Sequence, residues 1–199
     1  MTTDPTSSPE RILQSALSLF SEKGYDATSV REICEASGIT KPTLYHFYGS
    51  KEGVYRALVD GTLESLRTQM TQALEEGGSL ADRLRRLTLT YFDASRAEPD
   101  LARFILSLTH EPPSSAPRTD FLTFYDDVLA QVTRVIEAAE ARGEVSPGPV
   151  DVRLLILMGA LGEAVHGYLL AGRPELTPAL ADTLIDVVLK GWINPSSDS

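Results

Sequence analysis

Four large side chains follow one another without a break: Tyr45, His46, Phe47 and Tyr48, within the stretch GITKPTLYHFYGSKE. Adjacent residues of a helix point about 100° apart, so one core-facing stripe cannot bury all four. Some of these side chains must face outward. There a tyrosine ring can pack on a sugar while its hydroxyl donates to a phosphate oxygen. Core packing with incidental exposure of a ring is the alternative.

A second pattern, Glu163-x-x-His166, has the spacing used by di-iron sites in helical bundles. That chemistry needs two such motifs and further carboxylates, whereas the only other histidines are His46 and His110. The pattern therefore predicts a paired or pocket-lining polar contact, and we expect no metal and no cofactor. Glycine-rich phosphate loops, nucleophile elbows and HExxH motifs are also missing from the sequence, so we expect no catalytic residues and no enzyme.

The sequence predicts three helices in this region, and the aromatic run lies at the end of the third. Apolar residues at Ile12, Ala16 and Phe20 predict a first helix over about 9–24. A second helix begins after Thr28 or Ser29, with a glutamate at capping-box spacing, and ends at a glycine turn. A third covers about 40–47, with a threonine cap and a proline in its first turn. Two short helices joined by a glycine turn are typical of a helix-turn-helix motif, whose second helix enters the DNA major groove.

The rest of the chain is helical in pattern, punctuated by segments rich in glycine and proline. No convincing strand or fixed-period repeat occurs, so we predict an all-α protein of about nine helices: an N-terminal helix-turn-helix three-helix domain and a C-terminal helical bundle. The further helices are expected at about 51–76, 79–96, 99–110, 118–142, 150–171 and 177–193. The domain boundaries are expected at 1–8 for a disordered head, 9–55 for DNA binding, 56–194 for the bundle and 195–199 for a tail.

The formal net charge of −10 argues at first against nucleic-acid binding, which depends on neutralising phosphates. Its distribution weakens that objection, because residues 1–60 carry 6 basic and 8 acidic side chains and residues 61–199 carry 12 and 20. No acidic residue occurs from Ser37 to Lys51. The sequence has no secretory signal pattern and no uninterrupted run of about 18 apolar residues, so we expect a cytoplasmic protein without a membrane partner. The single cysteine, Cys34, fits that compartment.

Residues 28–59, TSVREICEASGITKPTLYHFYGSKEGVYRALV, resemble the DNA-binding region of the tetracycline-repressor (TetR) family of transcriptional regulators. The preceding helix, RILQSALSLFSEKGYDAT, matches the family's lead-in, so the resemblance covers roughly the first 60 residues. Beyond them the chain resembles the family only in plan, with about six further helices that would form a ligand-binding and dimerising domain. No pocket residue can be transferred across that domain.

The resemblance implies a set of DNA contacts. The start of the third helix would face the groove, with Pro42 against a thymine methyl, while Arg31 could reach a guanine edge. Tyr45, His46, Ser29 and Lys51 would hold phosphates. Apart from the resemblance, Thr28 and Ser29 lie at a helix start whose free backbone N–H groups can bind an anion. The full set is Thr28, Ser29, Arg31, Thr40, Lys41, Pro42, Thr43, Tyr45, His46 and Lys51.

One position departs from the family pattern. Members often have a histidine followed by a phenylalanine where this chain has Phe47 and Tyr48. A customary phosphate donor is therefore missing at 47. Tyr48 could bury its ring or replace that donor, and the sequence leaves both possibilities open.

The resulting hypothesis is a homodimeric repressor that a small-molecule effector releases from a double-stranded DNA operator. Dimerisation is expected because one short helix makes too few contacts, whereas two half-sites combine theirs. Glycines three apart and an apolar stripe on the last two helices predict the interface: Gly159, Gly162, Leu180, Leu184, Val187, Val188 and Gly191.

An effector pocket, largely apolar, is expected among the helices at 99–110, 118–142 and 150–171. Isolated polar residues within apolar patterns are the predicted orienting groups: Arg103, His110, Tyr125, Glu163 and His166. Two alternatives remain open at this point. The chain could be an all-α enzyme or metal-binding bundle without DNA binding, or a DNA-binding activator or regulator without an effector.

Overall fold

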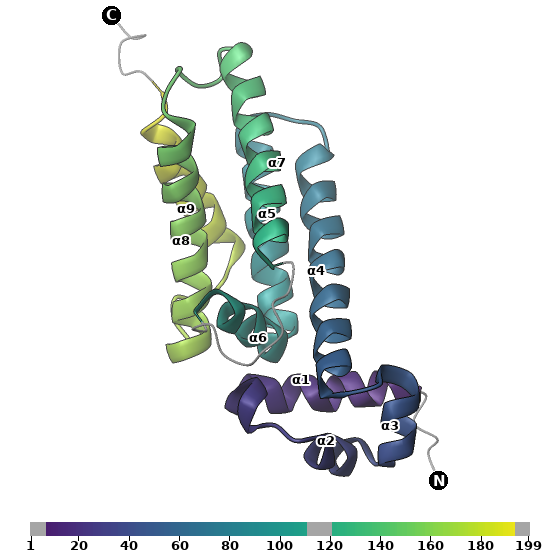
Figure 1. Ribbon diagram of the computed structural model, residues 1–199. Helices are drawn as coiled ribbons and strands as arrows, with labels where there is room; N and C mark the ends of the chain where they lie inside the picture. Colours follow the sequence, from purple (N-terminus) through teal and green to yellow (C-terminus); the bar gives the residue numbers. More distant parts are fainter. Residues whose placement is uncertain (1–6, 111–120, 194–199) are drawn as a thin grey trace, which may run out of the picture. The chain divides into compact units, whose positions relative to one another are not determined.

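The computed structural model describes residues 7–110 and 121–193. Within those ranges the chain forms helices and no strand, which confirms the predicted all-α class (Figure 1). The helices are α1 (Ser8–Ala27), α2 (Val30–Ser37), α3 (Lys41–Tyr48), α4 (Lys51–Glu75), α5 (Leu80–Ala97), α6 (Pro99–His110), α7 (Phe121–Ala141), α8 (Val150–Ala171) and α9 (Pro178–Lys190). Most predicted ends lie within one or two residues of these bounds; the ends of α1 and α9 and the start of α7 lie three away.

The chain divides into two compact units. Residues 1–64 and 100–121 make up unit 1, and residues 65–99 and 122–199 make up unit 2. The long helix α4 contributes its first half to unit 1 and its second half to unit 2. The assignment of separate DNA-binding and ligand-binding domains stays a prediction.

Unit 1 begins with three helices that pack on one another, α1, α2 and α3. Ser7 and Glu10 form a capping box at the start of α1, and Ile12, Ala16 and Phe20 bury the inner face as the spacing predicted. The glycine expected to end this helix, Gly24, has a non-helical backbone with a φ of 80°. It kinks the chain there, and α1 continues beyond the kink to Ala27.

Four aromatic rings form the centre of unit 1. The ring of Tyr55 lies 5.3 Å from that of Phe20, 4.9 Å from that of Tyr25 and 5.6 Å from that of Phe104, in edge-to-face arrangements. Such geometry suits the aromatic quadrupole and adds to the burial of apolar area. Residues of α1, α4 and α6 are thereby held in one core.

Unit 2 is built on α5, α8 and α9, which contact one another. Phe92 of α5, Val165 of α8 and Ala181 of α9 meet in one buried cluster. Two arginines of α5 hold the end of α4, because Arg83 donates to the Leu74 carbonyl at 2.7 Å and Arg86 donates to the Gly77 carbonyl at 2.9 Å. These bonds satisfy carbonyl groups that a helix terminus leaves without partners.

Candidate nucleic-acid interface

The turn between α2 and α3 fixes the direction in which α3 leaves. Gly38 ends α2 in the left-handed backbone conformation, with a φ of 64°, which residues other than glycine rarely adopt. Thr40 then caps α3, where its hydroxyl accepts a hydrogen bond from the Thr43 N–H at 3.4 Å, and Pro42 lies in the first turn. This is the predicted helix-turn-helix, built by the residues that the sequence suggested for it.

The aromatic run divides between core and solvent. Leu44 is fully buried, and the Tyr48 hydroxyl donates to the Pro9 carbonyl at 3.0 Å, so that its ring lies partly buried against α1. Burial also raises the pKa of the Tyr48 hydroxyl. Tyr45, His46 and Phe47 are exposed. The question that the sequence left open is answered for this structure: Tyr48 packs inward and Phe47 faces solvent.

The residues at the start of α3 are also accessible. Lys41 and Pro42 are exposed, and the Thr43 hydroxyl lies 2.8 Å from that of Thr40. On α2, the Arg31 guanidinium is bound to Glu35 at 2.6 Å, with both side chains exposed. A surface ion pair of this kind is worth little, so Arg31 can exchange the carboxylate for another acceptor.

Ser29 offers its donors to a carboxylate of its own helix. Its hydroxyl donates to Glu32 Oε2 at 2.7 Å and its backbone N–H donates to the same oxygen at 2.8 Å. Glu32 is also bound by Lys23, and that bond together with those from Ser29 lowers its pKa to about 2. A phosphate at this helix start would have to displace the Glu32 carboxylate.

Two predicted phosphate contacts have intramolecular roles. Thr28 is buried, and its hydroxyl donates to the Gly24 carbonyl at 2.8 Å, which leaves no donor for an outside anion. We therefore remove Thr28 from the candidate set. The Lys51 ammonium donates to the carbonyls of Tyr25 and Thr28, at 2.8 and 3.0 Å, and lies 4.0 Å from the centre of the Tyr25 ring. Lys51 thus fastens the start of α4 to the end of α1.

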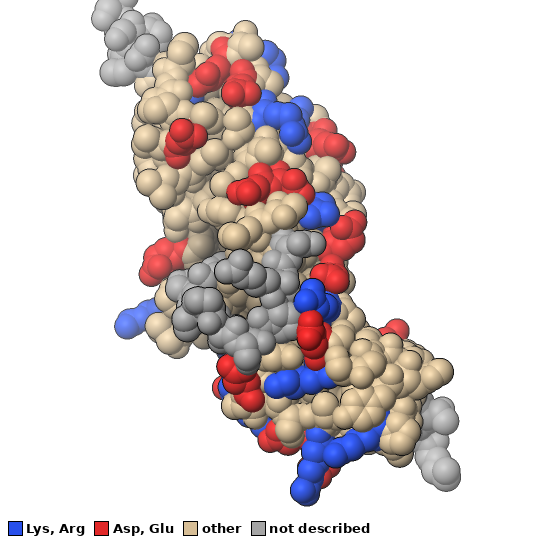
Figure 2. All heavy atoms as spheres, in the orientation of Figure 1, with Lys and Arg blue, Asp and Glu red and all other residues tan. Residues whose placement is uncertain are grey.

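The surface over α3 is mostly uncharged (Figure 2). This agrees with the absence of acidic residues between Ser37 and Lys51. Hydroxyl, imidazole and ammonium groups on such a surface can donate to phosphates, and no side chain of this stretch is a carboxylate that would repel them.

Helix α8 carries a second exposed surface, of different chemistry. Val152, Leu155, Ile156 and Leu170 are exposed, and Leu155 is 74% accessible. Val152, Leu155 and Ile156 follow, with the exposed Gly159, the 3–4 residue spacing of one helix face. Leu170 lies further along that face, beyond Glu163 and His166, which are exposed there as well. We call Val152, Leu155, Ile156, Gly159 and Leu170 the α8 stripe. Sequence reasoning missed its four large members because the opposite face of α8 is just as apolar, so no periodic contrast marks them.

The residues predicted for the dimer interface are placed unevenly. Val187 and Gly191 are exposed, and Gly162 is half-buried. Val188 is only 7% accessible and belongs to the core of unit 2, so it cannot contact a second chain as predicted. Leu180 and Leu184 are partly buried and pack on the core cluster that contains Phe92.

The predicted effector contacts are divided between the two units. Arg103 is exposed in unit 1, where its guanidinium pairs with Asp100 at 2.8 Å, whereas Tyr125, Glu163 and His166 are exposed in unit 2. His166 Nδ1 lies 3.6 Å from Glu163 Oε2 on the outer side of α8, so these groups face away from the core. The His110 side chain lies outside the described residues.

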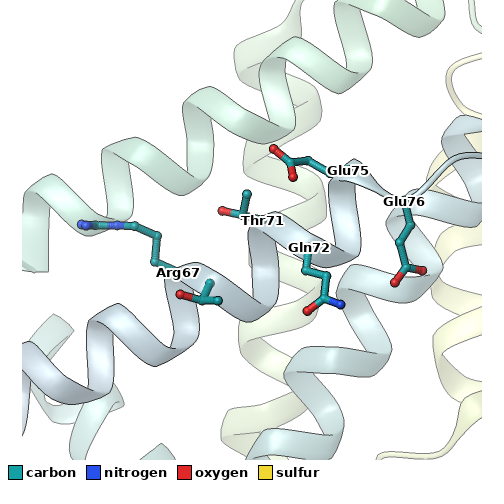
Figure 3. A pocket seen from close by; sticks show the side chains of 6 residues that line it. Arg67, Thr71, Gln72, Glu75 and Glu76 are labelled. Carbon is teal, nitrogen blue, oxygen red and sulfur yellow. The ribbon is translucent and has the colours of Figure 1, made fainter.

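A groove along α4 in unit 2 has a volume of about 590 Å³ (Figure 3). The residues that line it all have polar or charged side chains: Arg67, Thr68, Thr71, Gln72, Glu75 and Glu76. The Thr71 hydroxyl donates to Gln131 of α7 at 2.9 Å, and Arg67 pairs with Asp127 at 3.3 Å. None of the predicted effector contacts lines this groove.

In the part of the chain that the structure describes, no group of three His, Cys, Asp or Glu side chains could hold a metal ion. Among the same residues, α8 is one helix that could cross a membrane by its length and composition, although helices of soluble proteins pass the same test.

Comparison with known proteins places these features in a family. Residues 12–58 match the family described as "Bacterial regulatory proteins, tetR family". The HTH-type transcriptional repressor KstR2 of Rhodococcus jostii is 31% identical over 189 residues, covering 92% of this chain and 90% of the repressor. Other matches are shorter: the alignment with KstR2 of Mycolicibacterium smegmatis is 32% identical over 90 residues and spans 45% of this chain and 44% of that protein.

Solved structures share the fold over nearly the whole chain. The TetR family regulator PfmR of Thermus thermophilus has a TM-score of 0.75 at 24% identity, covering 95% of this chain and 99% of that one. The ketosteroid transcriptional regulator KstR2 of Mycobacterium tuberculosis has a TM-score of 0.74 at 20% identity, covering 96% and 97%. With the family match and the near-full-length relative, this fold identifies the chain as a member of the TetR family of DNA-binding transcriptional regulators.

Proposed function

We propose that this protein is a homodimeric repressor that binds a double-stranded DNA operator through α2 and α3 and leaves it when a small molecule binds unit 2. The observation that supports DNA binding is that α3 has one side packed against unit 1 and another side exposed to solvent. Leu44 and Tyr48 hold it against the unit, while Lys41, Tyr45 and His46 are exposed on a stretch of the chain, Ser37 to Lys51, that has no carboxylate. The proposed contacts are Ser29, Arg31, Thr40, Lys41, Pro42, Thr43, Tyr45 and His46.

Selection from a random duplex library with the full chain tests this part. We expect one inverted-repeat sequence to be enriched, with half-sites about 34–36 Å apart. Binding of that duplex should weaken steeply with salt, and Lys41→Ala should flatten the slope by roughly one for each lost phosphate contact. Retention of no duplex, together with a bound metal or cofactor, would favour the all-α enzyme or metal-binding alternative.

The second copy is proposed to cover the α8 stripe together with Val187, Gly191 and the half-buried Gly162. Exposed aliphatic side chains at this density are unusual on a monomer and typical of an interface. A two-fold arrangement would bring the same face of each copy together, because the interface of a dimer with this symmetry is self-complementary. This occupant also accounts for the apolar length of α8 without a membrane, in agreement with the proposed cytoplasmic location.

Release by an effector rests on the similarity to regulators whose names mention ligands. KstR2 of M. tuberculosis is described as a ketosteroid regulator, so steroid-derived compounds are the first class to screen. A ligand that raises the melting temperature and weakens operator binding about 5- to 150-fold would support the mechanism. A ligand that stabilises the protein but leaves operator affinity unchanged would contradict it, and would favour a regulator without induction.

A further inference from the structure

Phe47 is a large apolar side chain on the surface of the proposed DNA-contacting helix. It is 44% exposed, whereas Leu44 and Tyr48 on the same helix are buried and half-buried. Its ring centre lies 5.2 Å from that of His46 and 6.4 Å from that of Tyr48. Part of the ring is therefore supported by its neighbours, and the remainder is open to a partner.

The position of Phe47 decides which partner can reach it. Residues four apart lie on the same side of a helix, so Phe47 lies one turn beyond Thr43, which belongs to the proposed groove-facing start of α3. The surrounding stretch from Ser37 to Lys51 has no carboxylate. A polyanion is the partner that such a surface admits, and Phe47 is continuous with the surface already proposed for DNA.

A phenylalanine ring has neither a charge nor a hydrogen-bond donor, so it cannot neutralise a phosphate. Two parts of a duplex offer apolar surface to it: the deoxyribose rings of the backbone and the C5-methyl groups of thymine in the major groove. Contact with either would remove apolar area from water and would release no counterion. Its contribution to affinity would therefore be almost independent of salt.

We propose that Phe47 binds operator DNA through an apolar contact with thymine methyl or deoxyribose, and so supplies a salt-independent part of the affinity. This inference rests on the proposed function, since it requires α3 to contact DNA. Its chemistry differs from that of the other contacts, because Lys41, Tyr45 and His46 act through charge or hydrogen bonds. Phe47 also extends direct readout if the thymine methyl is its target.

The experiment uses the full chain and the duplex selected with the wild-type protein, with binding measured between about 50 and 200 mM salt. Phe47→Ala should weaken binding about 5- to 30-fold for each protomer, by the same factor at every salt concentration. Phe47→Leu should retain most of the affinity, because it keeps apolar area at that point. Leu122→Ala is the matched control, since Leu122 is an exposed apolar residue outside α3 and should change nothing.

A second duplex separates the two apolar targets. Replacing each thymine in turn by deoxyuridine removes the methyl group alone. If Phe47 contacts a methyl, one replacement should weaken wild-type binding and have no effect on Phe47→Ala; if it contacts deoxyribose, no replacement should act through Phe47.

The remaining outcomes are distinct. Unchanged affinity of Phe47→Ala, with Lys41→Ala still weakening binding, would overturn this inference and leave the proposed function intact. A flatter salt slope for Phe47→Ala would also overturn it, because the residue would then act through neighbouring phosphate contacts. If the wild-type protein selects no duplex, the proposed function itself fails, and this inference fails with it. Equal melting temperatures of the variants would exclude loss of folding as the cause.

Discussion

Helices α3 and α8 both leave large apolar side chains at the surface, yet the surroundings of those side chains differ. On α3 they are aromatic, Tyr45 and Phe47, and stand beside an exposed lysine and an exposed imidazole. On α8 they are aliphatic: Val152, Leu155 and Ile156 lie together with Gly159, and Leu170 lies further along the same face. Mixed aromatic and polar groups suit sugars, phosphates and base edges, whereas a group of exposed aliphatic side chains suits another protein surface.

The two helices are also supported differently. Tyr48 reaches back to the Pro9 carbonyl, and Lys51 ties the next helix to the end of α1, so α3 is held from both sides. α8 packs by its inner residues, Leu157, Leu161 and Val165, which are almost fully buried. The short helix α3 therefore has polar contacts in addition to one fully buried leucine, Leu44, whereas the long helix α8 has a row of buried apolar side chains. Each of the following predictions tests one side of this contrast.

The largest effect is expected for Leu155→Arg in the α8 stripe. A guanidinium placed at the centre of an apolar interface lacks a partner, which costs about 2–5 kcal/mol. We expect a dimer to become a monomer at micromolar concentration in sedimentation velocity experiments, and operator affinity to fall more than about 100-fold.

Leu122→Arg is the matched control for that substitution, because Leu122 is 73% exposed and Leu155 is 74% exposed. The control should remain dimeric and bind DNA normally. A Leu155→Arg protein that sediments as the wild type would remove the α8 stripe from the interface. Leu184→Arg tests it less cleanly, since Leu184 packs on the core of its own unit.

A smaller effect is expected for Lys51→Ala, which removes two charged hydrogen bonds and the contact with the Tyr25 ring. Such bonds contribute about 1.5–3 kcal/mol each at most, and partial exposure reduces the total. The melting temperature should fall by several degrees. Lys41→Ala provides the comparison: it should leave the melting temperature unchanged and flatten the salt dependence of DNA binding. The reverse pattern would return Lys51 to the phosphate contacts.

The sequence predicted the helices well because their signals are local. Gly38 and the capping residues Ser29 and Thr40 act within one turn, and the apolar spacing of Ile12, Ala16 and Phe20 repeats within one helix. These features also placed the aromatic run on α3. Family resemblance then added DNA-contact roles for individual residues, and the structure gives one of them, Lys51, an intramolecular role instead.

Features that depend on distant residues could not be predicted. Lys51 finds its acceptors 23 and 26 residues earlier in the chain, and Tyr48 finds its acceptor 39 residues earlier. Val188 follows the apolar stripe of α9 but faces the core, because the orientation of α9 is set by its packing on α5 and α8. Spacing alone reports that a face is apolar and does not report what covers it.

Gly159→Ala should act on the interface and not on the protomer. A Cβ atom built at Gly159 meets no atom within 4 Å, and replacing glycine in a helix interior favours the helix by about 0.5–1 kcal/mol. If a second copy approaches closely at this glycine, the dimer should weaken by a few fold while the isolated protomer gains stability. Gly61→Ala, equally open in α4, should show the gain alone. Equal dimer affinity for both variants would show that no close approach occurs at Gly159.

The smallest effect concerns two capping boxes, Ser29 with Glu32 in unit 1 and Ser79 with Asp82 in unit 2. Lys23 first, and then Ser29, lower the pKa of Glu32 from 4.5 to about 2; the pKa of Asp82 is lowered chiefly by the Ser79 hydroxyl. A carboxyl whose pKa is depressed on folding stabilises the fold above its unfolded pKa. That contribution is lost as the pH falls through the folded value.

Protonation of Glu32 should therefore lower the stability of the fold as the pH falls from about 4.5 to 2, and Glu32→Gln should remove this loss. Glutamine at this position still caps the helix, so the variant should fold normally at neutral pH. Glu32→Gln also removes a negative charge next to the Ser29 donors, so a phosphate is no longer repelled there and DNA affinity should rise by a few fold at low salt, whereas Asp82→Asn should not change it. Melting curves from pH 6 to pH 2 and binding at pH 7 check both results.

An unchanged acid profile for Glu32→Gln would mean that the Lys23 and Ser29 contacts contribute nothing in solution. Unchanged DNA affinity would mean that no phosphate approaches the start of α2, and the interface would then consist of α3 and Arg31.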